Sequence, residues 1–341
     1  MKNSIPTSVL RQYSFGNVKR IVPISSGLIH QTFRVETDQG QYIMQRLHPI
    51  LSSVQIAEDF YAVTNYLAKQ EFHAPHCVLT KKGSVLATQG KYVWRAQTKL
   101  PGRTFEVLKN PRMAKESGKI YGKFHRAMNE IPYRFKSKLA LHQTEKIYRH
   151  FIQVTKKFKN SFAFKEVESE VNLITQELPR YFLPKDLPMR VIHGDPKISN
   201  ILFDGTGRAT AVIDLDTCKR GSPLLDLGDA FRSWCGKKED DSRNTFSLPL
   251  FTAAWKGYQE GIHRLLTKKE LDRVPQVIGT ITLELACRFL TDYFEDYYFG
   301  WDEKRYETRA QHNLARARGQ LREFADYQKK FPRIKEIIEK S

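Results

Sequence analysis

The sequence predicts an α+β protein in which a small antiparallel-sheet lobe precedes a larger, mainly helical lobe. Apolar and polar residues alternate in several short runs between residues 18 and 98, as expected of strands with one buried face. After residue 103 the apolar spacing becomes that of amphipathic helices, and a short β-rich segment at 190–214 interrupts them. We therefore place the lobe boundary near residues 98–103 and divide the chain into lobes 1–100 and 101–341.

The first lobe is predicted to contain two hairpins and one helix. A Gly-containing turn at 38–40 joins the first pair of alternating runs, and Gln89-Gly90 joins the second pair. Residues 54–69 place apolar side chains three and four positions apart, which predicts a helix. The predicted strands are residues 18–22, 32–37, 41–47, 85–88 and 92–96.

The second lobe is predicted to be helical around the β-rich segment. Apolar residues there recur at helical spacing over long stretches. Active sites often lie in clefts between two lobes, so we expect the site to lie between these two. The predicted helices are residues 112–129, 145–178, 247–266, 276–299 and 307–338.

The composition is that of a globular protein with a high positive charge. The chain has 341 residues, of which 40% are apolar and 12% aromatic, which is enough to bury a sizeable core. The net charge of +19 would suit a nucleic-acid-binding protein, but the basic residues are spread along the chain and no nucleic-acid-binding module is recognisable. An anionic substrate is enough to favour a positive cleft, so we expect no specific nucleic-acid partner.

The cysteines and apolar runs predict the cellular setting. The four cysteines are widely separated and form no Cys-x-x-Cys pair, so we expect neither a zinc site nor disulfides. The apolar runs are far shorter than the roughly 20 residues that a membrane span needs. Residues 1–27 lack the apolar block of a secretory signal. We expect a cytoplasmic protein with no membrane association and no obligate protein partner.

The most informative stretch is Val191-Ile-His-Gly-Asp-Pro-Lys-Ile-Ser-Asn200, which Ile213-Asp-Leu-Asp216 follows. Asp195 can accept a hydroxyl proton, and Asn200 and Asp214 offer the oxygen ligands that Mg²⁺ prefers. Protein kinases use the same Asp-x-x-x-x-Asn spacing with a metal-binding Asp soon after it. The pattern predicts phosphoryl transfer from ATP, with Asp195 as catalytic base and Asn200 and Asp214 as Mg²⁺ ligands. A turn-capping Asp195 and an Asn200 at a strand edge are the structural alternatives.

A Gly/Ser loop is the first candidate for nucleotide binding. Ser25, Ser26 and Gly27 lie between two predicted strands, where backbone N–H groups can contact phosphates. The same residues also suit an ordinary turn. His30 ends this loop, and we expect its side chain to contact the acceptor.

The strand at 41–47 is the second candidate. A kinase would place its phosphate-binding lysine here, but this chain has Gln45-Arg46. Alternation puts the two side chains on opposite faces, so only one can face the nucleotide, and the residues leave open which. Glu58, on the following helix, is expected to pair with Arg46 near the nucleotide, although a solvated helix charge is an equal alternative.

Two further polar residues are candidates for binding the acceptor. Asp216 shares the face of Asp214 if the strand continues, so it can be a second ligand, contact the substrate or belong to a turn. Arg232 ends the run Asp226-Leu-Gly-Asp-Ala-Phe-Arg and is expected to face the cleft. Asp226 itself is expected to cap a helix start that supports the catalytic loop.

These motifs resemble the aminoglycoside phosphotransferase / choline kinase superfamily, and within it bacterial N-acetylhexosamine 1-kinases. The resemblance extends over nearly the whole chain. It implies a bilobal protein-kinase-like fold, ATP with Mg²⁺, and acceptor contacts from Arg288 and Tyr298. Arg288 could instead pair with Glu284 one turn earlier, and Tyr298 could be a core aromatic residue. The matching strings include residues 26–33, 42–46, 94–95, 193–200, 212–217, 226–232, 255–258, 284–299 and 312–320.

The resemblance implies that the chain phosphorylates the anomeric hydroxyl of an N-acetylhexosamine or a related sugar. The chain departs from the sugar kinases at Pro196, at Gly27-Leu28-Ile29-His30 and at Thr217-Cys218-Lys219-Arg220-Gly221. Several of these positions lie where the acceptor should bind, so the reaction type transfers better than the acceptor. The alternatives are an aminoglycoside, choline or another amino alcohol as acceptor, or a non-catalytic nucleotide-binding protein.

Overall fold

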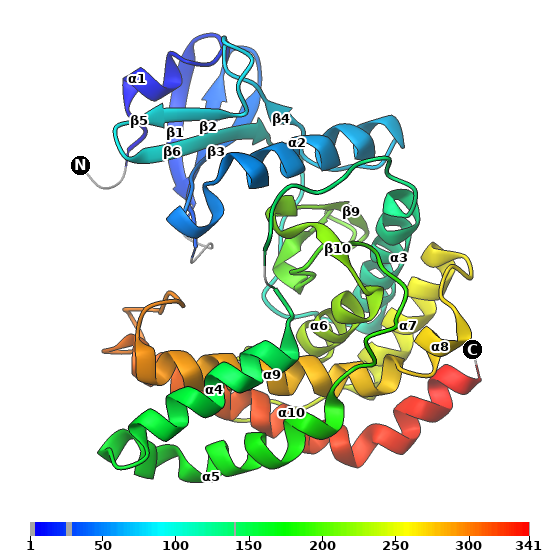
Figure 1. Ribbon diagram of the computed structural model, residues 1–341. Coiled ribbons are helices and arrows are strands. Elements are labelled where there is room, and N and C mark those ends of the chain that lie inside the picture. Colours follow the sequence, from blue (N-terminus) through cyan, green and yellow to red (C-terminus); the bar gives the residue numbers. More distant parts are fainter. Residues whose placement is uncertain (1–3, 25–28, 140, 341) are drawn as a thin grey trace.

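The computed structural model describes residues 4–24, 29–139 and 141–340, arranged as a sheet-containing lobe above a larger helical lobe (Figure 1). The predicted α+β, protein-kinase-like fold class is confirmed. Ser25, Ser26 and Gly27 lie outside the described residues. Among the described residues, no helix is long and apolar enough to cross a membrane.

The first lobe is built on a six-stranded antiparallel sheet with the order β1-β2-β3-β6-β4, in which β5 also pairs with β6. The two predicted hairpins and the sheet are present, and the short strand β4 was not predicted. The strands are β1 (Val18–Ile24), β2 (Gln31–Thr37), β3 (Gln41–Arg46), β4 (Cys77–Val78), β5 (Leu86–Gln89) and β6 (Tyr92–Thr98).

The two faces of this sheet differ. One face packs in a small apolar core with the short helix α1 (Thr7–Leu10), and Met44 and Trp94 are buried there. Gln45 is directly opposite Arg95 in the β3–β6 ladder, and the Arg95 guanidinium lies 3.7 Å from the Phe60 ring centroid of helix α2 (Val54–Lys69). The face towards α2 is therefore the one that brings polar groups to the second lobe.

The second lobe contains eight helices and two short strand pairs among the residues that the structure describes. The predicted helix 145–178 is in fact two helices, because the chain turns at 159–161 and the Ser161 hydroxyl caps the second helix by accepting from the Phe164 N–H (3.1 Å). The helices are α3 (Pro111–Met128), α4 (Thr144–Phe158), α5 (Phe162–Glu177), α6 (Pro223–Cys235), α7 (Leu248–Ile262), α8 (Lys268–Leu271), α9 (Val274–Glu295) and α10 (Arg309–Glu339).

The short strands surround the predicted motif. They form two antiparallel pairs, of which one joins β7 (Arg190–Ile192) to β10 (Lys219–Gly221) and the other joins β8 (Ile201–Phe203) to β9 (Ala209–Val212). Four 3₁₀ turns complete the described elements: η1 (Pro49–Leu51), η2 (Leu178–Tyr181), η3 (Ile198–Asn200) and η4 (Leu215–Thr217).

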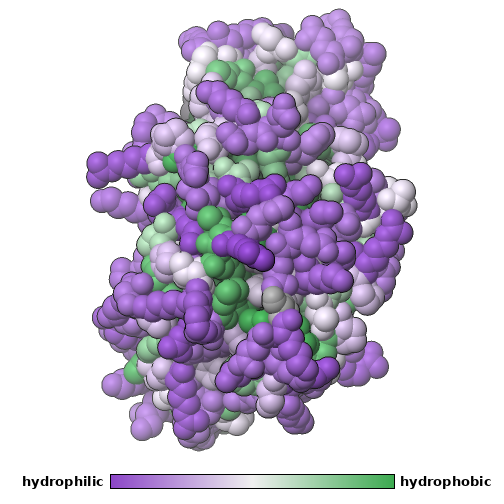
Figure 2. Space-filling model, turned by 90° about the vertical axis from the view of Figure 1, so that its right-hand side faces the viewer, coloured by the Kyte–Doolittle hydropathy of each residue, from purple (hydrophilic) through white to green (hydrophobic). Residues whose placement is uncertain are grey.

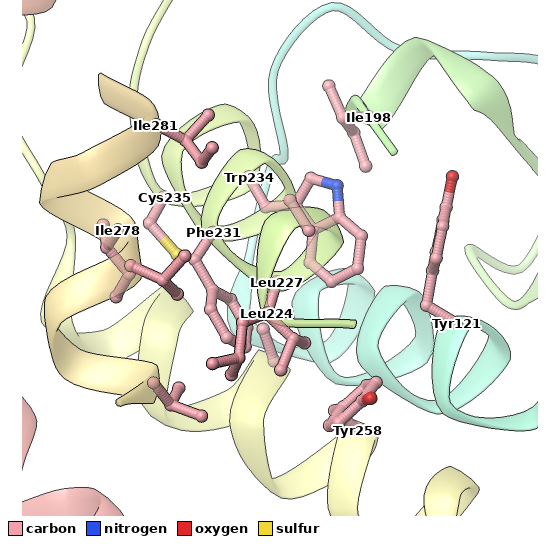
Figure 3. Close-up of a cluster of buried hydrophobic side chains, with 14 of the residues drawn as sticks. Tyr121, Ile198, Leu224, Leu227, Phe231, Trp234, Cys235, Tyr258, Ile278 and Ile281 are labelled. Atoms are coloured by element: carbon pink, nitrogen blue, oxygen red, sulfur yellow. The ribbon is translucent and has the colours of Figure 1, made fainter. Parts of the chain in front are cut away.

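Helix α6 lies at the centre of the second lobe. Its Leu224, Leu227, Phe231 and Trp234 side chains are buried between α9 on one side and α3 on the other (Figure 3). Each fully buried apolar side chain of this size contributes roughly 1.5–3 kcal/mol to folding. Because α6 is packed on several sides, it can support the predicted catalytic loop, residues 193–200, which contacts it.

The outer surface is mostly hydrophilic, as expected from the high net charge of the chain. On the face drawn in Figure 2, hydrophilic side chains cover most of the surface and apolar ones gather in a narrow strip near the middle. Below that surface, α3 and α7 are packed closely, since a Cβ on Gly118 would lie 1.9 Å from the Ala254 carbonyl oxygen.

Candidate active site

The loop that follows β7 is held by one buried carboxylate of α6. The Asp226 carboxylate accepts hydrogen bonds from the backbone N–H of His193 (2.6 Å) and of Gly194 (2.8 Å). It also accepts from His125 Nε2 of α3 (2.9 Å). Asp226 therefore supports the loop as predicted, although the cap of α6 is Ser222, whose hydroxyl accepts from the Leu224 N–H.

Two more side chains of α6 hold the far end of the loop. The Ile198 N–H donates to Ser233 Oγ (3.1 Å), and the Trp234 indole N–H donates to the Pro196 carbonyl (2.9 Å). With Asp226, helix α6 therefore binds the loop on both sides of Asp195.

Glycine is required at residue 194. Its φ is +84°, a left-handed conformation that other residues rarely adopt, and a Cβ there would lie 2.6 Å from the Thr217 carbonyl oxygen. The Thr217 hydroxyl donates to the His193 carbonyl (2.8 Å), so the segment after β9 packs directly against the loop. This close approach is what aligns residue 195 with residues 214–216.

Asp195 lies in an ion-paired and hydrogen-bonded environment. Its carboxylate accepts from Lys197 Nζ (2.7 Å) and from Asn200 Nδ2 (3.1 Å), and the same Nδ2 donates to the Asp195 carbonyl (2.8 Å). Burial would raise the pKa of Asp195, but the Lys197 charge and these hydrogen bonds hold it below its ordinary value. The lowered pKa keeps the carboxylate ionised. The side chain is 28% exposed and is therefore accessible.

Asn200 and Asp214 fit a divalent cation. Because the Asn200 amide nitrogen donates to Asp195, its Oδ1 atom remains free, and neither Oδ1 nor the Asp214 carboxylate has a hydrogen-bond partner among the described residues. The Ile213 N–H donates to the Asn200 carbonyl (3.0 Å), which places Asp214 beside Asn200. Hard oxygen donors of this kind suit Mg²⁺, which is held by one or two protein groups together with substrate phosphates.

The charge on Asp214 is also unfavourable without a cation. Burial and the neighbouring Asp216 carboxylate raise the pKa of Asp214 above its ordinary value. Its φ of 64° turns the chain at the end of β9. Among the described residues, no three His, Cys, Asp or Glu side chains gather as a metal cluster, so any ion here would need ligands from the substrate.

Asp216 forms a buried link between the lobes. Its carboxylate forms a bidentate ion pair with Arg95 of β6, in which Arg95 NH2 donates to Oδ2 (2.9 Å) and NH1 donates to Oδ1. His30 Nε2 donates to the same Oδ2 (3.1 Å), since His30 Nδ1 accepts from the His48 N–H (3.0 Å). Burial would raise the pKa of Asp216, but Arg95 and His30 hold it well below its usual range.

Gln45 and Arg46 lie in different surroundings. Gln45 is buried, and its Oε1 accepts from Arg95 NH2 (2.6 Å), so Gln45 faces the second lobe. The Arg46 guanidinium lies 4.6 Å from the Tyr92 ring centroid instead. The expected pair of Glu58 with Arg46 is not formed, because Glu58 Oε2 is 3.0 Å from Lys136 Nζ.

Arg232 does not face an open cleft as expected. Its side chain is buried, and all three nitrogens already donate: Nε and NH2 to Asp229 Oδ1 (3.0 and 2.6 Å) and NH1 to Glu239 Oε1 (3.1 Å). Carboxylates thus engage three of the five N–H groups of the guanidinium. Burial opposes the charge, but the two carboxylates raise the pKa of Arg232 overall.

Arg288 lies within the last two turns of α9, which ends at Glu295, and Tyr298 lies in the segment that follows this helix. The Arg288 guanidinium packs over the rings of Tyr298 (5.6 Å) and Phe299 (5.3 Å) and forms no hydrogen bond or ion pair with any described residue. The buried Asp292 fixes this turn by accepting from the backbone N–H groups of Tyr298 (2.7 Å) and Phe299 (2.9 Å). The backbone of the turn is thus held by Asp292, while the Arg288 guanidinium donates no hydrogen bond to a described residue.

Sequence reasoning missed Arg95 as a site residue. Its signal was a charged side chain between the apolar residues Trp94 and Ala96 of a predicted strand. Its partner Asp216 is 121 positions away, and no local pattern could pair them.

Comparison with known proteins gives a consistent result. The model of the family described as "Phosphotransferase enzyme family" matches residues 20–260. A homoserine kinase from Zymomonas mobilis is 25% identical over 258 residues, covering 75% of each chain. A homoserine kinase from Rhizobium meliloti is 23% identical over 286 residues, covering 83% of this chain and 82% of its own.

Solved structures share the fold. A microcompartment-associated aminopropanol kinase superposes with a TM-score of 0.65 at 18% identity, covering 96% of this chain and 97% of its own. The amicoumacin kinase hAmiN, solved in complex with AMP-PNP, Ca²⁺ and Ami, gives a TM-score of 0.62 at 15% identity over 97% of this chain and 92% of its own.

Proposed function

Because this chain belongs to the phosphotransferase enzyme family and is an ATP-dependent small-molecule kinase, we propose that Asp195 orients and deprotonates the acceptor hydroxyl. In this reaction the acceptor oxygen bonds to the γ-phosphorus of ATP, the bond from that phosphorus to the β–γ bridging oxygen breaks, and ADP leaves. The acceptor proton passes to the Asp195 carboxylate. The observation that supports this role is the ionised carboxylate of Asp195, whose Oδ2 is held by Lys197 and Asn200 while Oδ1 accepts no hydrogen bond among the described residues, beside the unpartnered oxygens of Asn200 and Asp214.

The low pKa of Asp195 is compatible with this role. In phosphoryl transfer, bond breaking to the leaving group runs ahead of bond making in most analyses, so the hydroxyl needs orientation more than early deprotonation. Lys197 keeps the carboxylate ionised and fixes one of its oxygens, which leaves it an acceptor for the substrate hydroxyl. The main contributions are positioning and charge stabilisation.

We propose that Asn200 and Asp214 hold a Mg²⁺ ion that accompanies ATP. When bound, such an ion neutralises charge on the phosphates. The buried Arg95–Asp216 pair keeps the two lobes, 1–100 and 101–341, in register on either side of the nucleotide. We assign Gln45 rather than Arg46 to the nucleotide side, and the loop with Ser25, Ser26 and Gly27 remains a proposed phosphate contact.

For the acceptor we propose a small hydroxylated metabolite, with the anomeric hydroxyl of an N-acetylhexosamine as first candidate. Its support is the Arg288 guanidinium, whose donors have no partner among the described residues, and the neighbouring Tyr298 side chain. His30 and Asp216 remain candidates near the acceptor, but their side chains already bind each other. Homoserine is the second candidate, because homoserine kinases are among the relatives.

An acceptor panel tests this proposal. Wild-type protein with Mg²⁺ and ATP is offered N-acetylglucosamine, N-acetylgalactosamine, homoserine, aminopropanol, choline and kanamycin, and ADP release and phosphorylated product are both measured. We expect acceptor-dependent ADP release with one small class of these compounds. Turnover of kanamycin alone would contradict the acceptor assignment, and ADP release with none of a wider metabolite set would contradict the catalytic one.

A further inference from the structure

His142 occupies an unusual position between the catalytic loop and helix α9. It lies in the segment that joins α3 to α4, and its side chain is only 6% exposed. Ring atom Nδ1 is 2.9 Å from Glu284 Oε1 of α9, and Nε2 is 3.2 Å from the Gly194 carbonyl oxygen. A carboxylate and a carbonyl can only accept hydrogen bonds, so both ring nitrogens must carry a proton. His142 is therefore an imidazolium in this structure.

The groups around His142 favour this charge. Burial lowers the pKa of His142, but the Glu284 carboxylate, which also accepts from the Thr144 hydroxyl, and Asp229 of α6 outweigh it, and Arg288 of α9 opposes them in part. The net effect is a pKa above the ordinary histidine value. On the remaining side, Lys219 of β10 donates to the carbonyl of the neighbouring Leu141 rather than to the ring.

The carbonyl that His142 binds belongs to the peptide group that leads directly into Asp195. The N–H of the same peptide group donates to His193 Nδ1 (3.3 Å), so both ends of that group are held. Rotation of this peptide would change the direction of the Asp195 side chain. Asp226 holds the preceding N–H groups but does not contact this carbonyl.

We propose that the His142 imidazolium is a positioning residue, which fixes the Gly194–Asp195 peptide group and links it to helix α9. Glu284, which holds the ring, lies one helical turn before Arg288, the free guanidinium proposed to contact the acceptor. A displacement of α9 when the acceptor binds would therefore reach Asp195 through two hydrogen bonds. The kinetic part of this inference rests on the proposed function, whereas the charge state of His142 does not.

The chain provides a matched control. His150 of α4 also pairs with a glutamate of α9, since its Nε2 is 3.0 Å from Glu295 Oε2. That pair is exposed, at 49% for the histidine side chain and 26% for the glutamate, and its ring contacts no residue of the catalytic loop. Replacement of His150 removes a similar ion pair without touching Asp195.

The first experiment compares His142→Ala and His150→Ala with whichever acceptor of the panel the wild type phosphorylates. We expect His142→Ala to lower kcat at least about tenfold while KM for ATP is unchanged, because misdirection of a reacting group slows the chemical step. His150→Ala should match the wild type. An unchanged kcat in His142→Ala, or equal losses in the two variants, would overturn the proposal.

The second experiment uses Glu284→Gln and keeps the proposal testable if His142→Ala fails to fold. Without the carboxylate the pKa of His142 should fall towards about 6.5 or lower. The charged form is then lost at a lower pH than in the wild type, so the fall of kcat with rising pH should be shifted to lower pH in Glu284→Gln. Identical pH profiles of kcat for the two proteins would contradict the linkage.

The third measurement needs no acceptor. A histidine NMR titration of the wild-type protein should show the pKa of the His142 ring above the ordinary histidine value of about 6.5. A His142 pKa at or below that value would overturn the inference even in an active enzyme. Conversely, a protonated ring in a protein that turns over no acceptor would leave the charge assignment intact and contradict the proposed function alone.

Discussion

The two sides of the site differ in how their polar groups are bound. Around the loop that carries Asp195, the polar groups bind one another, whereas Arg288 of α9 forms no hydrogen bond with a described residue. Asp226 and Thr217 hold the backbone that leads to Asp195, and Arg95 holds Asp216. At the end of α9, Asp292 fixes the backbone of the turn, but the Arg288 guanidinium has no hydrogen-bond partner among the described residues. The polar groups of the first side thus constrain one another, whereas the Arg288 guanidinium makes only contacts with aromatic rings.

This difference explains why the reaction type is easier to infer than the acceptor. Each group on the loop side has partners that constrain its chemistry, since a change in one leaves another buried and unpaired. On the α9 side a free donor such as Arg288 can bind several classes of oxygen-bearing acceptor. Substitutions on the two sides should therefore have different consequences, and the following variants test that contrast.

The largest effect is expected for Asp195→Asn. Loss of the carboxylate that receives the hydroxyl proton should lower kcat by about 10²–10⁴-fold, with ATP affinity unchanged. Asp204→Asn is the control, because Asp204 lies in the turn after β8 and only accepts from residues of that turn, such as Thr206. Steady-state kinetics and ATP titration calorimetry measure both properties. Activity in Asp195→Asn equal to that of the control would contradict the assigned role.

Arg95→Met should chiefly reduce stability. Removing one partner of a buried ion pair leaves the Asp216 charge uncompensated and costs about 3–5 kcal/mol of unfolding free energy. Arg34→Met is a control on the same sheet, since the Arg34–Glu36 pair is partly exposed, at 33% and 26%, and should cost about 0–1 kcal/mol. Urea unfolding of both variants measures the difference. Equal losses of unfolding free energy in the two variants would show that the Arg95–Asp216 pair stabilises the protein no more than a surface pair does.

Arg288→Ala should weaken binding of the acceptor without changing binding of ATP. A hydrogen bond from a charged group is worth about 1.5–3 kcal/mol, so KM for the acceptor should rise by about 10–100-fold while KM for ATP stays constant. Arg322→Ala is the control, because Arg322 is an exposed arginine on α10. A rise in KM for ATP instead would place Arg288 on the nucleotide side and contradict the division of the site.

The smallest effect is expected for Lys219→Met. Burial lowers the pKa of Lys219 to about 8, so the folded protein binds the proton less tightly than the unfolded chain does. Wild-type stability should therefore rise with pH between about 8 and 10.5, where the folded protein has lost this proton and the unfolded chain still holds it. Lys219→Met should raise Tm by a few degrees at pH 7 and by less at pH 10.

The control for that variant is Lys159→Met, because Lys159 is an exposed lysine in the turn after α4. Differential scanning calorimetry at the two pH values measures both variants. A Lys219→Met Tm that is lower than the wild type at pH 7 would show that the ammonium group is stabilising where it lies, and would contradict the account of its burial.

Periodicity predicted the fold well because most of the elements are amphipathic. The strands of the first lobe and helices such as α2 and α3 agree with the prediction to within a few residues. Helices α1, α6 and α8 were not among the predicted helices. Another exception is the break between α4 and α5, a three-residue turn at 159–161 between two helical runs. Only the cap at Ser161 marks it, and an isolated serine is weak information in a sequence.

The site was only partly predictable for a different reason. Asp195, Asn200 and Asp214 come from one short motif, so their proximity follows from local structure. The pairs Arg95–Asp216 and His142–Glu284 join residues 121 and 142 positions apart. Glu58 and Arg232 were assigned to the cleft from their type, but partners from other segments, Lys136 and Glu239, bind them in the folded chain.

The most direct test of the central claim is a crystal structure of the protein with AMP-PNP and Mn²⁺, in which anomalous scattering locates the metal. We expect an ion within about 2.0–2.3 Å of Asn200 Oδ1 and of an Asp214 carboxylate oxygen, bridging to the triphosphate beside Asp195. A metal ion bound to the nucleotide but contacting neither side chain, or a nucleotide bound away from Asp195, would contradict the account.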